Sequence, residues 1–125
     1  MIRYEIEMLL GIKRIYDKAG ITEGKRVLVD RLWPRGVKRS TSNIDVWLKE
    51  VAPSTELREW FSHDPEKWEE FKERYRKELK GNKAFDELVK MAREGDITLI
   101  YSSKDETHNN AEVLQEEIQK ALNRS

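Results

Sequence analysis

The spacing of apolar residues changes along the chain, and the two spacings separate strands from helices. Two short segments contain uninterrupted or nearly uninterrupted apolar runs. Val27–Leu32 opens on Val-Leu-Val before the charged pair Asp30 and Arg31, and Ile97–Tyr101 is apolar apart from Thr98. Uninterrupted aliphatic and β-branched runs of this length are typical of strands covered on both faces. Each segment therefore predicts a buried strand.

Two earlier segments predict further strands. In Met1–Leu10 apolar residues alternate with charged ones, the pattern of a half-buried strand, so this segment is either an extra strand or a flexible extension. Ile12–Tyr16 predicts a second strand with apolar residues on both faces. The connection Asp17–Lys25 is too short for a helical crossover. It therefore predicts that Ile12–Tyr16 and Val27–Leu32 run antiparallel.

From residue 42 the apolar spacing becomes three and four, which predicts helices with one apolar face each. Residues that accept hydrogen bonds from free backbone N–H groups precede each helix, and Pro53, Gly81 and Gly95 end three of the helices. The predicted caps are Ser42, Ser54, Asp64, Asn82 and Thr107. The apolar stripes are Ile44, Trp47, Leu48 and Val51; Leu57, Trp60 and Phe61; Trp68, Phe71, Tyr75 and Leu79; Phe85, Leu88, Val89 and Ala92; and Ala111, Leu114, Ile118 and Ala121.

These elements predict an α/β fold. We expect a small mixed sheet with a central parallel pair, Val27–Leu32 and Ile97–Tyr101, covered by about five helices in a single domain over residues 1–125. Parallel neighbours end at the same sheet edge, where open α/β sheets bind ligands. The loops Asp30–Lys38 and Ser102–Asn110 should therefore face each other across one crevice.

Composition narrows the functional classes. Lys and Arg total 24, as do Asp and Glu, so no net charge draws the chain toward nucleic acid or an anionic membrane. Cysteine is absent from the sequence, which excludes disulfides and thiol catalysis. No apolar run approaches the roughly 20 residues of a membrane span. We expect a cytoplasmic monomer or small homo-oligomer without membrane contact, whose 38% charged residues give a thermophile-like bias.

Cationic and amide side chains gather in the two facing loops. The guanidinium groups of Arg31 and Arg35 suit phosphate or carboxylate, and the start of the last helix favours an anion. The candidate ligand-binding residues are Arg31, Trp33, Arg35, Lys38, Tyr101, Lys104 and Asn109. A structural alternative stays open, in which Arg31 pairs with Asp30 or Asp105 in an ion-pair network. Core packing is the preferred interpretation of Trp33.

Two residues are candidates for catalysis. His108, in the first turn of the last predicted helix, could act as a general base or acid, and an ordinary surface histidine fits the pattern equally well. Asp30 ends a covered strand and needs a partner, either Arg31 or a ligand hydroxyl. With two histidines and no cysteine we expect no metal site. Glycine-rich dinucleotide and ATP motifs are absent, so the cofactor stays unknown.

Four stretches carry a resemblance to a known family. They are VLVDRLWPRGVK (Val27–Lys38), WLKEVAPSTELREWF (Trp47–Phe61), HDPEKWEEFKERY (His63–Tyr75) and TLIYSSKDETHNNAEVL (Thr98–Leu114). The chain resembles the YeaO-like proteins, domain-of-unknown-function family 488, from Ile12 to its carboxyl end. The resemblance implies a small bacterial or archaeal α/β protein. It brings no established activity, cofactor or catalytic residue.

Three functional hypotheses follow. The leading one is a crevice that binds an anionic small molecule, such as a nucleotide or phosphorylated metabolite. Whether a reaction occurs is open; if it does, hydrolysis or group transfer aided by His108 or Asp30 is the simplest choice. The second is a nucleic-acid module using Trp33, Arg35, Lys38 and Arg39, which zero net charge disfavours. The third is a regulatory or interaction scaffold without pocket chemistry.

Overall fold

One parallel sheet organises the molecule. The computed structural model describes residues 9–17 and 24–124, so most of the predicted strand Met1–Leu10 lies outside the described residues. The strands are β1 (Leu10–Arg14), β2 (Lys25–Leu28), β3 (Val46–Trp47) and β4 (Ile97–Tyr101). Their order is β1-β4-β2-β3, and every neighbouring pair is parallel.

The predicted parallel relation of the two apolar segments is confirmed, with Val27 opposite Leu99. The predicted mixed sheet is wrong. The antiparallel relation to β2 predicted for Ile12–Tyr16, of which residues 12–14 lie in β1, is also wrong. Both errors have one cause: β4 lies between β1 and β2 and pairs with each of them in parallel. The parallel part of the sheet is thus the whole sheet.

Within the described residues, four α-helices cover the sheet instead of about five. They are α1 (Thr55–Phe61), α2 (Trp68–Leu79), α3 (Lys83–Glu94) and α4 (Asn110–Asn123). Short 3-10 turns occur at η1 (Arg39–Thr41), η2 (Lys49–Val51) and η3 (Pro65–Lys67).

The helix predicted from Ser42 is wrong, because Val46 and Trp47 pair with β2 as strand β3. The apolar residues of this segment divide between two cores. Ile44 and Trp47 pack on one sheet face, and Val51 is buried on the other. Strand pairing and burial on two faces therefore override a spacing that also fits one helical stripe.

Most predicted helix starts are confirmed. The Ser54 hydroxyl accepts a hydrogen bond from the Leu57 N–H at 3.1 Å, and the Asn82 amide oxygen accepts one from the Phe85 N–H at 3.1 Å. Asp64 caps η3, which leads directly into α2. The cap predicted at Thr107 is wrong, because Asn109 accepts from the N–H of Glu112 and begins α4.

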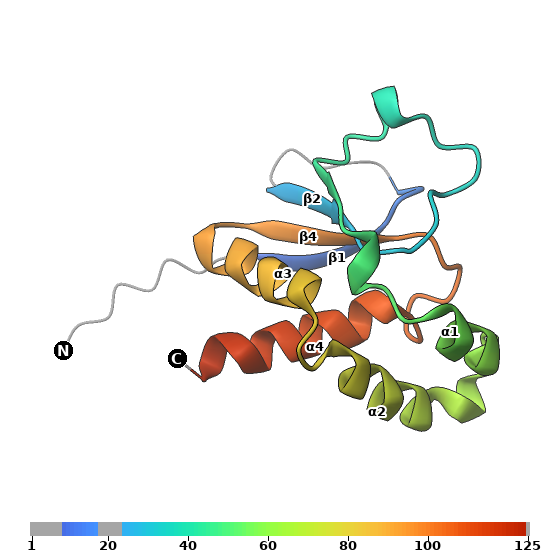
Figure 1. Cartoon of the computed structure of the whole chain (residues 1–125). Coiled ribbons are helices and arrows are strands. Elements are labelled where there is room, and N and C mark those ends of the chain that lie inside the picture. Colours follow the sequence, from blue (N-terminus) through green and yellow to red (C-terminus); the bar gives the residue numbers. More distant parts are fainter. Residues whose placement is uncertain (1–8, 18–23, 125) are drawn as a thin grey trace.

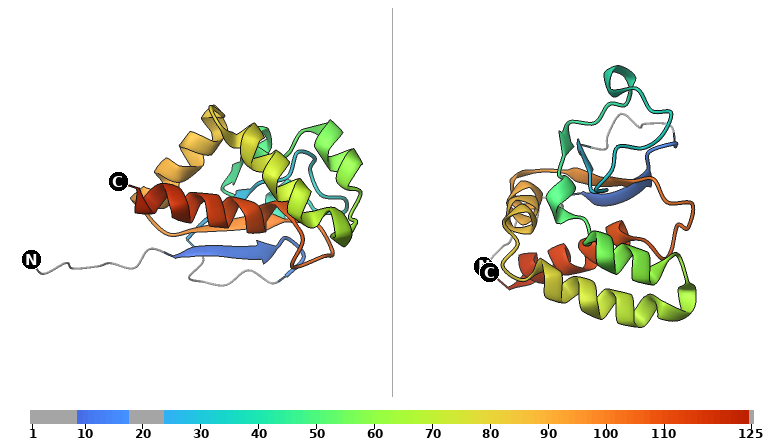
Figure 2. Two further views of the ribbon diagram at one scale, coloured as in Figure 1. Left: turned by 90° about the horizontal axis from the view of Figure 1, so that it is seen from below. Right: turned by 45° about the vertical axis from the view of Figure 1, so that its right-hand side comes forward.

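The helices lie on one face of the sheet, and an irregular segment covers the other (Figures 1 and 2). On the helical face Val27, Leu99 and Tyr101 pack against buried residues of all four helices. On the opposite face Leu28 and Ile100 pack with Ile15 against four side chains of the β2–β3 connection and of β3, which we call the second core: Trp33, Val37, Ile44 and Trp47. Both central strands are thus covered on both faces, as predicted, but β2 spans Lys25–Leu28 rather than the predicted Val27–Leu32, and Leu32 is 63% exposed.

No helix within residues 9–17 and 24–124 combines the length and apolar character needed to cross a membrane.

Candidate functional site

A cavity of about 430 Å³ lies at the carboxyl ends of β2 and β4. Its walls come from both loops that the sequence placed opposite each other, and also from the segment around α1. The cavity is lined by Tyr16, Asp30, Arg31, Leu32, Trp33, Pro34, Arg35, Ala52, Pro53, Arg58, Phe61, His63, Phe71, Ser102, Ser103, His108, Asn109 and Asn110. The cavity therefore occupies the sheet edge where ligands bind in open α/β folds.

Asp30 holds the two strand ends together. Its Oδ2 accepts hydrogen bonds from the Ser102 N–H at 2.9 Å and from the Ser102 hydroxyl at 2.6 Å. Its Oδ1 accepts one from the Asn110 side-chain amide at 3.3 Å. Burial raises the pKa of Asp30, and the hydrogen bonds from Ser102 and Asn110 oppose that rise. Asp30 is the one carboxylate among the described residues that line the cavity.

Arg31 is engaged with the backbone rather than with Asp30 or Asp105. Its Nη2 donates to the carbonyl of Ala52 at 3.1 Å, and its Nε donates to the carbonyl of Pro53 at 3.3 Å. A Glu50 carboxylate oxygen lies 4.0 Å from Nη1. Arg31 thus ties the loop after β2 to the segment before α1, a largely structural role at the cavity wall.

Two other arginines line the cavity with unoccupied guanidinium groups. Arg35 and Arg58 are exposed, and neither side chain forms a hydrogen bond or ion pair with any residue in the described ranges. The Arg35 carbonyl accepts a hydrogen bond from the Tyr16 hydroxyl at 3.2 Å, which holds this turn against the end of β1. Sequence reasoning missed Arg58, although it lies three residues before Phe61 and so on the same side of α1.

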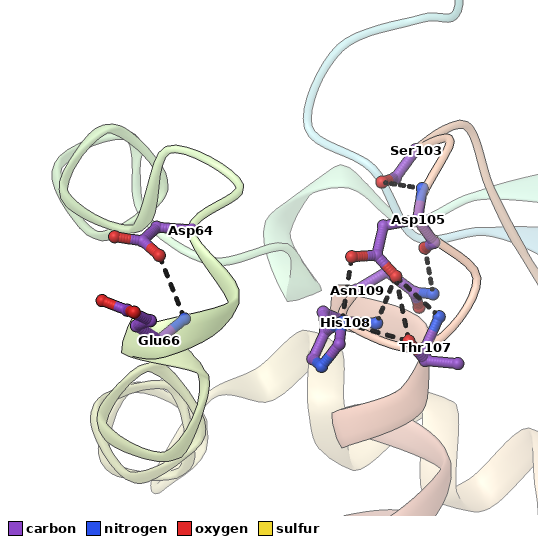
Figure 3. A network of polar contacts seen from close by, with 7 residues as sticks. All are labelled: Asp64, Glu66, Ser103, Asp105, Thr107, His108 and Asn109. Atoms are coloured by element: carbon purple, nitrogen blue, oxygen red, sulfur yellow. Dashed lines mark hydrogen bonds and ion pairs between the residues drawn. The ribbon is translucent and has the colours of Figure 1, made fainter.

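His108 is oriented by a neighbouring carboxylate (Figure 3). Its Nδ1 lies 2.9 Å from Asp105 Oδ2 and 3.0 Å from the Thr107 hydroxyl, and its ring packs edge-on against Trp68. Hydrogen bonds from the backbone N–H groups of Thr107 and His108 lower the pKa of Asp105 strongly. An ionised Asp105 selects the tautomer with hydrogen on Nδ1 and leaves Nε2 as the available nitrogen.

Two further candidates, Trp33 and Asn109, line the cavity but already have hydrogen-bond partners. Trp33 lines the cavity, and its indole N–H donates to the Val37 carbonyl at 2.7 Å while its ring contacts Trp47 in the second core. Asn109 also lines it, but its side chain is committed to capping α4 and to the Asp105 carbonyl.

Three predicted ligand-binding residues lie outside the cavity wall. Tyr101 is 3% exposed in the helical core, because its side chain follows the alternation of β4, and burial raises its pKa. Lys38 is exposed and lines a separate surface depression together with Gly36 and Val37. Lys104 is exposed and does not line the cavity. Among the described residues no group of three or more His, Asp or Glu side chains is arranged to hold a metal ion.

A family model described as the inactive DUF488-N3 subclade matches residues 9–125. The chain belongs to the DUF488, YeaO-like family. The chain is 43% identical to the uncharacterized protein YeaO of Escherichia coli K12 over 108 residues, which is 86% of this chain and 94% of YeaO. It is 38% identical to the uncharacterized protein Rv3073c of Mycobacterium tuberculosis H37Rv over 108 residues, 86% of this chain and 92% of that protein. No solved structure matches the chain. The resemblance read from the sequence is thus confirmed, and these relatives bring no activity with them.

Proposed function

We propose that the cavity binds an anionic small molecule and that binding, rather than turnover, is its function. The observation that carries this proposal is the pair of unoccupied guanidinium groups, Arg35 and Arg58, which line one cavity with a single carboxylate. Guanidinium groups make paired, charge-assisted hydrogen bonds with phosphate or carboxylate. Asp30 accepts hydrogen bonds from Ser102 and Asn110 and forms no hydrogen bond or ion pair with either arginine, although the positive charge of Arg58 favours its ionised form.

Binding is favoured over catalysis by the state of the two candidate catalytic residues. Asp30 accepts three hydrogen bonds and serves as part of the cavity floor. His108 keeps one available nitrogen, which suits a hydrogen bond to an anion as well as proton transfer. The matching family model describes its subclade as inactive, which agrees with a binding role.

The nucleic-acid alternative receives less support. The guanidinium of Arg39 stacks on Trp33 at 4.7 Å and on Trp47 at 5.0 Å, so the indole that would stack on a base is already covered on one side. The zero net charge points the same way.

A thermal-shift experiment tests the proposal. The wild-type chain is heated with phosphate, sugar phosphates, nucleotides and short oligonucleotides at low and high salt. We expect stabilisation by at least one small anion. Arg58→Ala should abolish that shift and leave the unliganded melting temperature nearly unchanged, because Arg58 is exposed on a helix where alanine is well tolerated.

Arg93→Ala, at an exposed position of α3 outside the cavity, is the matched control and should respond to the anion like the wild type. The proposal is wrong if no small anion stabilises the chain, or if Arg58→Ala and Arg35→Ala both keep the full shift. Oligonucleotide binding that weakens steeply with salt, without any small-anion effect, would favour the nucleic-acid alternative.

A further inference from the structure

We infer that the ligand is a nucleoside monophosphate, held by its base, its sugar hydroxyls and its phosphate at three different parts of the cavity. This inference rests on the proposed function, because it takes the anion site at Arg35 and Arg58 as given and asks what else the cavity recognises.

Part of the cavity wall is apolar and aromatic. Phe61 and Phe71 line the cavity from the helical layer, where they are 5% and 3% exposed and pack with ring centroids 4.4 Å apart, and Trp33 and Pro34 line it from the loop after β2. An apolar, partly aromatic wall of this kind favours a flat apolar group, such as a heterocyclic base, over a purely polar ligand. A bare phosphate or sulfate would use none of this surface.

Exposed apolar side chains lie at the mouth of the cavity. Exposed apolar side chains that gather around a pocket are a feature of ligand-binding grooves. Among the described residues the large hydrophobic side chains that stay exposed are Leu9 at 42%, Tyr16 at 50% and Leu32 at 63%, and the last two line the cavity. A ligand with an apolar ring would cover Leu32 and Tyr16, which argues for a base near the rim.

At the cavity floor, the Asp30 carboxylate can accept a further hydrogen bond. Asp30 Oδ2 accepts two hydrogen bonds at 2.6 and 2.9 Å, whereas Oδ1 accepts one longer bond at 3.3 Å from Asn110. A carboxylate oxygen has room for two donors, so Oδ1 can accept one more. A ligand hydroxyl supplies that donor, and an acceptor-only ligand would not. The negative charge of Asp30, which the Arg58 charge partly offsets, also disfavours a chain of several phosphates, and we assign a single phosphate to the cavity-lining Arg35 and Arg58.

The volume agrees with this assignment. A cavity of about 430 Å³ falls in the range of roughly 300–1,000 Å³ that is usual for whole small-molecule ligands. It is larger than a single inorganic anion requires. The sequence has no glycine-rich phosphate loop, so the phosphate would be recognised by side chains.

Isothermal titration of the full chain with matched ligands tests the inference. The probes are the four common nucleoside monophosphates, a ribose phosphate without base, a nucleoside without phosphate, a dideoxynucleoside monophosphate and inorganic phosphate. We expect at least one nucleoside monophosphate to bind about tenfold or more tightly than the ribose phosphate, the nucleoside and the dideoxy analogue.

Ribose phosphate binding as tightly as every nucleoside monophosphate would overturn the inference while leaving the anion site intact. If no phosphate binds at all, the proposed function fails with it. Equal binding of the dideoxy analogue would overturn the role of Asp30.

A matched pair of surface variants tests the placement of the base. Leu32→Ser should weaken the nucleoside monophosphate by about threefold or more and leave the ribose phosphate unchanged, because it removes apolar contact at the rim only. Leu9→Ser, at an exposed leucine outside the cavity, should change neither. Equal weakening of both ligands by Leu32→Ser would show that the base does not lie there.

Discussion

Two aspartates in neighbouring loops have opposite electrostatic environments. Burial raises the pKa of Asp30, so its ionised form reduces stability at neutral pH, and this effect is relieved as the pH falls through its folded-state pKa. Hydrogen bonds from the Thr107 and His108 N–H groups lower the pKa of Asp105, so its ionised form adds stability. A carboxyl group kept charged at such a loop is structural, whereas a buried one in a cavity is a candidate for ligand contact.

The role of Asp105 gives a pH-dependent prediction. Because its folded-state pKa is depressed, its contribution is fully present above its unfolded pKa, about 4, and is lost as the pH falls below that value. Asp105→Ala should therefore lower the free energy of unfolding by about 1 to 2 kcal/mol at pH near 7. The difference from wild type should shrink on acidification. Chemical denaturation at neutral and acidic pH measures it.

Glu87→Ala, an exposed change in the middle of α3, is the control and should show no such trend. A difference for Asp105→Ala that stays constant from neutral to acidic pH would contradict the assigned role.

At the scale of elements, the sequence predicts what depends on local pattern. The buried strands β2 and β4 follow from the apolar runs Val27–Val29 and Ile97–Tyr101, and the caps at Ser54 and Asn82 follow from residue chemistry. The order of strands in the sheet cannot be predicted from local pattern, because the pairing of β1 with β4 joins residues far apart in the chain and leaves no local signal. The segment around Trp47 shows the same limit, since its spacing fits a helix until β2 is known to pair with it.

The sequence predicts where the candidate site lies better than it predicts which side chains line it. The position of the crevice follows from the parallel relation of β2 and β4, which the sequence supports. The contribution of Arg58 does not, because it comes from a helix whose packing across the strand ends is a tertiary property. Lys38 and Lys104 lie in the right loops but not on the cavity wall, and residue order in a loop does not define side-chain direction.

Gly24, just before β2, allows the close approach of β2 to the start of β4 and so gives a testable prediction. Gly24 has φ of +67°, and a β-carbon there would overlap the backbone carbonyl of Asp96, which accepts a hydrogen bond from the Lys25 N–H at 3.0 Å. Gly24→Ala should force β2 and β4 apart and lower the free energy of unfolding by more than about 2 kcal/mol. Denaturant titration measures the loss.

Gly36→Ala is the matched control. Gly36 also has positive φ, +74°, but nothing lies within 4 Å of its added β-carbon. It should therefore show only the conformational strain, about 1 to 2 kcal/mol. Equal losses for the two variants would mean that the close approach to Asp96 is unimportant.

On the scale of the whole molecule, two unlike layers lie on the two faces of the sheet (Figure 1), and residues of both layers line the cavity at the carboxyl ends of β2 and β4. One layer is helical and carries Arg58 and Phe61. The other is the irregular segment between β2 and β3, which depends on the second core for its position. The Trp47 indole N–H donates to the Asp30 carbonyl at 2.8 Å and so joins the second core directly to the cavity floor. Ligand binding should therefore depend on residues that do not touch the ligand.

Trp47→Ala tests this dependence. The change removes the ring that packs on Trp33 and the hydrogen bond to Asp30, so we expect about 2 to 3 kcal/mol of lost stability and faster hydrogen exchange over residues 30–47. Anion-induced stabilisation should fall as well. Phe85→Ala, which trims a partly buried ring of α3 in the helical core, should destabilise the chain without opening residues 30–47 or weakening the anion effect. If the two variants behave alike in exchange and in anion response, the second core contributes only to overall stability, and the wall of the cavity is held by the helical layer alone.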